Sequence, residues 1–128
     1  MQGDSAVIDH LNKLLTGELT AVDQYFQHSR MYQDWGLHKL YTRIDHEKDD
    51  EQRHANALIE RILFLEGTPD LASRHALKIG RDVPEMLRND LDLEYQVARE
   101  LREAIAYCEQ VQDFVTRRIL VQLLDDTE

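Results

Sequence analysis

Apolar side chains recur every three or four residues along most of the chain, which is the period of an α-helix that buries one face. Five glycines and two prolines in 128 residues leave few signals for strands or tight turns. Residues 1–128 are therefore expected to form a single all-α domain. Breaks in the pattern divide it into four helices, predicted over about 4–34, 37–66, 83–110 and 113–128.

The connections between these helices predict how they are arranged. A break at Gly36 is so short that the first two helices must be antiparallel neighbours. Residues 67–82, GTPDLASRHALKIGRD, carry turn residues and weak periodicity, so we expect a crossover there. A helix of about thirty residues is roughly 45 Å long, and an extended crossover can span that length. The third helix is then parallel to the second, in a four-helix bundle with one long crossover.

The fourth helical segment, at about sixteen residues, is half the length of its partners. It shows no stop signal before Glu128. We therefore expect the inner faces of the other helices to be exposed beyond its end. Two explanations fit: the natural chain continues past Glu128, or another subunit covers the gap.

Ionisable residues interrupt the apolar stripes near the middle of the helices. Glu18 stands on the stripe of the first helix, and Glu94 on that of the third. Glu51 and His54 lie one turn apart on the second helix, where both can bind the same metal ion. Ionisable groups are seldom buried unless they are paired or bind a metal. These residues therefore predict a metal centre inside the bundle.

A repeat in the spacing suggests where the remaining ligands lie. Glu18 and Glu51 are 33 residues apart, and the same step from Glu94 reaches Thr127, which is followed by Glu128. Di-iron bundles take one Glu from each of two helices and a Glu-x-x-His from each of the other two. The matching fourth-helix His falls beyond residue 128. Glu128 is the candidate fourth-helix carboxylate, provided that the helix rotates or bulges by one residue.

Composition narrows the possible partners and location. A formal charge of −10 argues against nucleic acid, because phosphates require a basic surface. The single cysteine, Cys108, excludes an internal disulfide and suits a reducing compartment. The first residues, MQGDSAVIDHLNK, lack the apolar core of a signal peptide, and no apolar run is long enough to span a membrane. We expect a cytoplasmic protein with no membrane partner.

Several segments along the chain are specific enough to compare with known families: MQGD (1–4), LNKLLTGEL (11–19), QYFQHSRMYQDWGL (24–37), LIERILFLEG (58–67), LREAI (101–105) and CEQVQDFV (108–115). These segments resemble bacterioferritin. The resemblance implies a ferritin-like bundle, 24 copies of which assemble into a hollow homo-oligomeric shell that stores iron inside it as ferric mineral. Such a shell oxidises Fe(II) with O2 or peroxide at di-iron ferroxidase sites. A methionine from each of two subunits holds its haem.

The resemblance also implies roles for individual residues. His46 and Asp50, one turn apart on the second helix, match an iron site on the inner surface of the shell. Without the resemblance, these two residues would be read as a solvated helix face. Tyr25 matches a tyrosine close to the di-iron site. The residues that match its ligands are Glu18, Glu51, His54 and Glu94.

The chain departs from the bacterioferritin pattern at two places. Gln52 stands where the haem methionine is expected, and an amide is not a useful axial ligand for haem iron. Nothing in the spacing of Met31 makes it a substitute, so we expect no Met-ligated haem in a homodimer of this chain. Thr127 stands where the fourth-helix glutamate is expected, and a hydroxyl cannot bridge metals as a carboxylate does.

Four functions are therefore compared. The favoured one is an iron-storage ferroxidase with an intra-subunit di-iron centre. A non-catalytic structural subunit that co-assembles with a haem-bearing, fully liganded partner is the alternative that Gln52 and Thr127 favour. A small di-iron bundle acting on peroxide, or a helical adaptor with no metal, fits the sequence less well.

Overall fold

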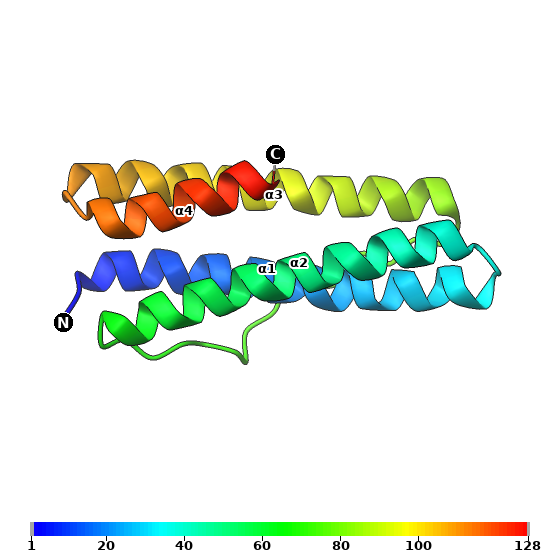
Figure 1. Ribbon diagram of the computed structural model, residues 1–128, viewed down its shortest axis with the longest axis horizontal. Helices are drawn as coiled ribbons and strands as arrows, with labels where there is room; N and C mark the ends of the chain where they lie inside the picture. The colour runs from blue at the N-terminus through cyan, green and yellow to red at the C-terminus, as the bar shows by residue number, and fades with distance from the viewer. Residues whose placement is uncertain (1, 128) are drawn as a thin grey trace.

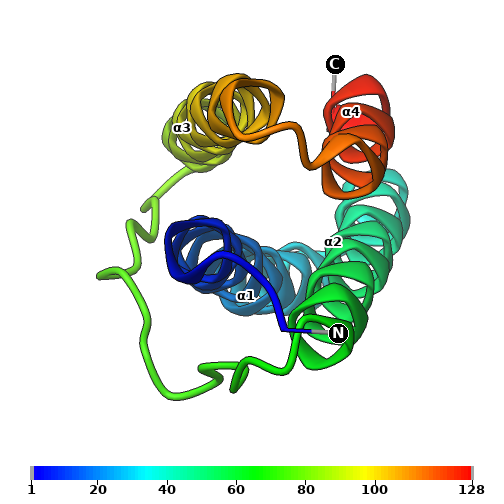
Figure 2. The same ribbon diagram turned by 90° about the vertical axis from the view of Figure 1, so that its left-hand side faces the viewer.

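The protein is a bundle of four helices. Its computed structural model describes residues 2–127 and comprises α1 (Ser5–Asp34), α2 (His38–Phe64), α3 (Val83–Gln110) and α4 (Phe114–Thr127). Viewed along the bundle, α1 packs beside α2 and α3, and α4 closes the ring between α3 and α2 (Figure 2). The expected all-α four-helix bundle with a long crossover is confirmed.

Side-chain caps explain where the helices begin. The Asp4 carboxylate accepts hydrogen bonds from the backbone N–H groups of Ala6 and Val7, at 2.8 and 3.2 Å. Asp82 accepts from the backbone N–H of Glu85 at 3.0 Å in the same way, ahead of α3. These caps satisfy amide groups that a helix start leaves without intrahelical partners.

The second helix ends two residues earlier than the sequence suggested. Phe64 is its last residue, and the Gly67 N–H donates back to the Ile62 carbonyl at 2.9 Å. Glu66 adopts the left-handed conformation, with φ of 64°, that reverses the chain at this point.

The crossover, residues 65–82, runs the length of the bundle beside α1, so α3 begins at the same end as α2 and runs parallel to it (Figure 1). It has no secondary structure of its own. Because the crossover forms no helix or strand, side chains of α1 accept the hydrogen bonds that several of its backbone N–H groups donate. The backbone N–H donors and their acceptors are Asp70 to Asn12 Oδ1 (2.8 Å), His75 to Thr20 Oγ1 (3.0 Å), Lys78 to Gln24 Oε1 (3.0 Å) and Gly80 to His28 Nε2 (3.1 Å).

The core consists of two apolar clusters with polar residues between them. Leu15 belongs to one cluster and Ala21 to the other, and the buried Glu18 lies between the two on α1. Cys108 is buried in the first cluster as a small apolar side chain. Within residues 2–127, no helix combines the length and the apolar character needed to cross a membrane.

The short α4 leaves part of the bundle uncovered in the described chain. Leu87 and Leu91 lie on the apolar stripe of α3 that also carries Glu94, and the notional burial of this whole stripe is wrong, since the two leucines are 41% and 49% exposed. The described part of α4, Phe114–Thr127, covers only about half the length of α3 (Figure 1). A groove of about 1140 Å³ remains between α2 and α3, as the short fourth helix led us to expect.

A buried arginine attaches α4 to α2. Arg61 donates from Nε to the Thr116 hydroxyl at 2.9 Å, and its Nη2 lies 3.5 Å from the Asp113 carboxylate. Its guanidinium also stacks over the Phe64 ring, 4.7 Å from the ring centroid. Asp113 in turn caps α4 by accepting from the backbone N–H of Thr116 at 3.1 Å. This network fixes the start of α4 against the rest of the bundle.

Candidate metal centre

Three of the predicted ligands converge between the two apolar clusters. One oxygen each from Glu18 and Glu51 and a ring nitrogen of His54 lie within 4.8 Å of one another. His54 Nδ1 is 3.1 Å from Glu18 Oε2 and 3.6 Å from Glu51 Oε2. The three residues are 1%, 5% and 6% exposed, in that order. We name this group the α1–α2 trio.

Helix geometry explains why the trio forms. Glu51 and His54 are three residues apart on α2, so their side chains lie on one face, about one turn apart. α1 runs antiparallel to α2 and presents Glu18 at the same depth (Figure 1). Both helices are amphipathic, and the faces that pack together carry the trio inward.

Burial and mutual proximity shift the protonation of the trio. Burial, followed by the adjacent Glu18 carboxylate, raises the pKa of Glu51 to about 8. Burial lowers the pKa of His54, but the adjacent Glu18 and Glu51 carboxylates outweigh it and raise this pKa to about 10. Without a bound cation, the site therefore holds protons at neutral pH to reduce its own charge repulsion.

Glu94 and Tyr25 form a second pair next to the trio. The Tyr25 hydroxyl donates a hydrogen bond to the Glu94 carboxylate, joining α1 to α3. Burial and the charge of Glu51 raise the pKa of Glu94 to about 8. Burial and the charge of Glu94 raise the pKa of Tyr25 well above its ordinary value, so the tyrosine remains a hydrogen-bond donor. Glu94 lines the same groove as Glu51 and His54.

The donor set suits a divalent transition metal. Two carboxylates and an imidazole are ligands that iron and similar ions accept. Glu51 Oε2 is buried without a hydrogen-bond partner among the described residues, which is costly unless a cation or water satisfies it. The trio therefore fits a metal ion, with Glu94 available on the facing helix.

The structure adds a residue that the sequence analysis missed. Asp126 Oδ2 lies 3.5 Å from His54 Nε2, the ring nitrogen on the far side from Glu18. A carboxylate there fixes the imidazole orientation and leaves Nδ1 to face a metal. The 33-residue spacing predicted a ligand at Thr127, which directly follows Asp126 on the same turn of α4. Thr127 instead donates its hydroxyl to the Leu123 carbonyl at 2.8 Å, and Glu128 lies outside the described residues.

The remaining predicted residues of α2 lie outside the trio. His46 Nε2 is 3.7 Å from Asp50 Oδ2, and the His46 side chain is 72% exposed. Asp50 also pairs with Arg53 and borders the groove. Gln52 follows Glu51 in sequence, and its side chain is exposed. The pair formed by His46 and Asp50 is therefore an accessible carboxylate–imidazole contact, separate from the buried centre.

Comparison with known proteins decides the family. The family model described as ferritin-like domain matches residues 8–128. A bacterial ferritin from Synechocystis sp. is 61% identical over 128 residues, which cover all of this chain and 82% of that protein. The chain belongs to the ferritin-like family, among the bacterial ferritins.

Other members of this family show the same relationship. A bacterial ferritin from Pseudomonas aeruginosa is 57% identical, with 100% of this chain and 82% of that protein covered. A bacterioferritin from Mycolicibacterium paratuberculosis is 42% identical, with 100% and 80% covered. The resemblance stated from the sequence segments is thus confirmed.

The raised pKa values predict a pH dependence for the metal-free ferritin fold. In the folded chain Glu51 and Glu94 have pKa values of about 8, above the ordinary value of 4.5. The folded state therefore holds more protons than the unfolded state between these two values, and stability falls as pH rises. His54, raised from 6.5 to about 10, acts in the same direction above its ordinary pKa. Urea denaturation of metal-free protein should show a free energy of unfolding at least about 1 kcal/mol lower at pH 8 than at pH 5.

The control for this pH dependence is Glu94→Gln, which removes one of the titrating groups. Its loss of stability between pH 5 and pH 8 should be smaller than in the wild type. A stability that rises over this range, or an identical slope in the variant, would contradict the protonated centre.

Proposed function

We propose that this ferritin-like chain stores iron by binding Fe(II) in the bundle, oxidising it and passing the ferric product to a mineral inside an oligomeric shell. The observation that carries the proposal is the α1–α2 trio, a buried set of two carboxylates and one imidazole in which Glu51 Oε2 has no hydrogen-bond partner among residues 2–127. The names of the relatives, bacterial ferritin and bacterioferritin, support the same function.

Each residue of the centre has a distinct task in this proposal. Glu18 and Glu51 supply carboxylate oxygens, and His54 supplies Nδ1, for the first Fe(II). Glu94 lies next to Glu51 and would hold the second Fe(II) together with it. Asp126 keeps the His54 ring in place from its other nitrogen. Tyr25 holds Glu94 by its hydrogen bond.

Binding and oxidation both follow from the charges of the site. The carboxylic protons of Glu51 and Glu94 must leave when Fe(II) enters, which couples metal uptake to proton release. Two Fe(II) ions then supply the two electrons that reduce peroxide, or the first two that reduce O2. Anionic oxygen ligands favour the ferric state over the ferrous state, so the site drives the oxidation.

The proposal extends to assembly and location by likeness to the family. We place the chain in a cytoplasmic homo-oligomeric shell of 24 subunits, with His46 and Asp50 as an iron site on its inner surface. Gln52 in place of the haem methionine leads us to expect no Met-ligated haem between two copies of this chain. A Soret absorption band in the purified homo-oligomer would contradict that expectation.

An anaerobic Fe(II) titration of the metal-free oligomer tests the centre. Binding should saturate near two Fe(II) per subunit and release protons at neutral pH, because the carboxyls are protonated beforehand. Glu51→Gln should lose at least one of the two, whereas Glu60→Gln, an exposed carboxylate on the same helix, should not. Saturation at one Fe(II) or none in the wild type would contradict a complete di-iron centre in this chain.

A second candidate function is a structural subunit that co-assembles with a fully liganded, haem-bearing bacterial ferritin. Thr127 favours it, because the fourth helix offers a hydroxyl, bonded to its own backbone, where a bridging carboxylate is expected. In that case the titration would saturate at one Fe(II) or none. Co-expression with a haem-bearing bacterial ferritin would then yield mixed shells.

A further inference from the structure

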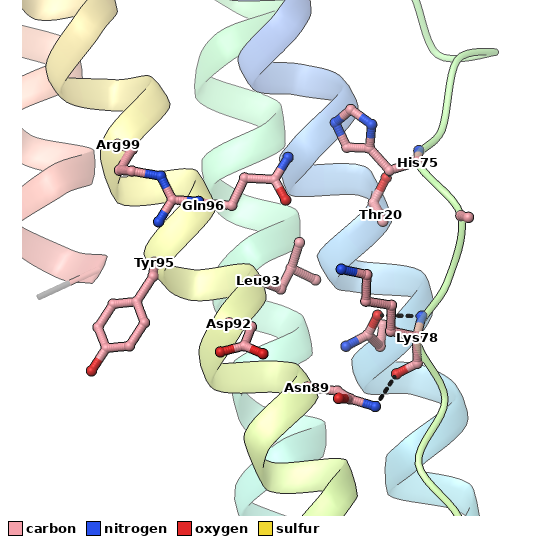
Figure 3. Close-up of a pocket in the computed structure, with 11 residues that line it drawn as sticks. Thr20, His75, Lys78, Asn89, Asp92, Leu93, Tyr95, Gln96 and Arg99 are labelled. Carbon is pink, nitrogen blue, oxygen red and sulfur yellow. Dashed lines mark hydrogen bonds between the residues drawn. The ribbon is translucent and has the colours of Figure 1, made fainter.

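A second cavity lies between α1, α3 and the crossover, and of its lining residues Tyr95 alone also borders the groove beside the metal centre (Figure 3). Its volume is about 490 Å³, within the range of small-molecule sites. The α3 residues that line it include Asn89, Leu93 and Gln96 (Figure 3), whereas Glu94 lines the groove beside the metal centre.

Hydrogen bonds to both α1 and α3 fix the crossover segment that lines this cavity. His75 donates its backbone N–H to the Thr20 hydroxyl at 3.0 Å, and Lys78 donates its own to Gln24 Oε1 at 3.0 Å. The Asn89 amide on α3 donates to the Lys78 carbonyl at 3.1 Å (Figure 3). The backbone that carries the His75 and Lys78 side chains is therefore fixed although it has no secondary structure.

The polar groups at the floor of the cavity are already partnered. Thr20 donates its hydroxyl to the Thr16 carbonyl at 2.7 Å, and Gln24 donates its amide to Asp90 at 2.9 Å. Leu93, also buried, provides an apolar surface between them. Recognition of a ligand would therefore depend on the charged side chains around the cavity.

Those charged side chains are mainly basic. Lys78 extends from the crossover, and Arg99 extends from α3 beside Gln96 (Figure 3). Among residues 2–127, neither Lys78 nor Arg99 has a carboxylate within 4.0 Å, whereas Arg74 and Arg81 of the same crossover pair with Asp23 and Glu85.

The balance of charge in this cavity differs from that of the chain as a whole. In a chain with a formal charge of −10, two cations that have no carboxylate within 4.0 Å among residues 2–127 line one cavity, and the His75 imidazole adds a third nitrogen group. Asp92 is the single carboxylate among the lining residues. A cavity with this balance favours a negatively charged ligand.

We propose that this cavity binds a small oxyanion of the phosphate type. The Arg99 guanidinium offers a planar pair of N–H donors and the Lys78 ammonium a point charge, and both kinds of cation bind phosphate oxygens. A hydroxyl of protonated phosphate could donate to Asp92, which a fully deprotonated anion could not do. The site does not involve the iron centre and is independent of the function proposed above.

Calorimetric titration of the metal-free oligomer with inorganic phosphate tests the proposal. Saturable binding is expected, and Lys78→Gln and Arg99→Gln should each weaken it about tenfold or more, because each removes a charge-assisted contact. Lys39→Gln and Arg118→Gln, which change exposed cations outside the cavity, should leave the affinity within about twofold of the wild type.

Three results would overturn this inference. One is the absence of saturable binding up to about 10 mM phosphate, since a weaker site would be indistinguishable from general ion attraction. Another is equal weakening by the cavity variants and the exposed controls. The third is equal binding of chloride, which would show that the cavity does not recognise an oxyanion. Circular dichroism of the variants checks that the helices are retained.

Discussion

Replacing His54 by alanine is expected to lower the initial rate of Fe(II) oxidation at least about a hundredfold, because the variant removes the only nitrogen of the α1–α2 trio. The same change leaves Glu18 and Glu51 next to each other without the imidazole that contacts both of them. Stopped-flow measurement of ferric absorbance after mixing Fe(II) with O2 or peroxide would record the rate. Spectroscopic Co(II) titration of the metal-free protein reports binding separately from turnover.

Two further variants are compared with His54→Ala, one expected to give a partial loss and one that serves as a control. Asp126→Asn keeps His54 but weakens the contact with its Nε2, so a loss of about tenfold in metal affinity is expected. His46→Ala changes an exposed imidazole on the same helix and should leave the initial rate unchanged. An oxidation rate in His54→Ala equal to the wild-type rate would remove the trio from the reaction and favour the structural-subunit function.

Replacing Arg61 by methionine is expected to destabilise the fold by about 2–3 kcal/mol. Methionine keeps most of the buried apolar volume but leaves the Asp113 carboxylate without its ion pair and the Thr116 hydroxyl without its donor. This loss of folding free energy is smaller than is usual when a buried ion pair is broken, because the Asp113 carboxylate remains partly exposed to water. Urea denaturation at fixed protein concentration, with the midpoint and slope compared, measures the change.

The matched control is Arg118→Met, which changes an exposed arginine on α4. Its free energy of unfolding should stay within about 0.5 kcal/mol of the wild type. If Arg61→Met were equally mild, the attachment of α4 would depend on apolar contacts such as those of Leu120 and Leu123 in the core rather than on the Arg61 network.

Local periodicity in the sequence accounts for most of the fold. The 3.6-residue repeat identifies which side of each helix is apolar, and the helix starts predicted at about 4 and 83 lie within one residue of Ser5 and Val83. Chain length also determines the crossover, since only an extended segment can return to the far end of the bundle. The same repeat places Glu18, Glu51 and His54 on inner faces, where the structure has them.

Hydrophobic periodicity could not predict how far each helix is shifted along its axis relative to its neighbours. The 33-residue step led to Thr127, whereas packing of α4 brings Asp126 to His54. A shift of one residue turns a helix by about 100°, so a small error in depth changes which side chain faces the centre. Such offsets depend on how side chains of two helices interlock, which no single-helix pattern contains.

The sequence alone determined four helices, their order and direction, and three inward-facing residues with metal-binding chemistry, because these follow from contacts between residues close along the chain. Only the tertiary structure decided which helices cover which faces. It determined that the uncovered part of α3 includes Leu87 and Leu91, brought Asp126 to His54, and placed Lys78 and Arg99 on the lining of one cavity. Each of these depends on contacts between distant segments, whose geometry is set by packing of the whole bundle.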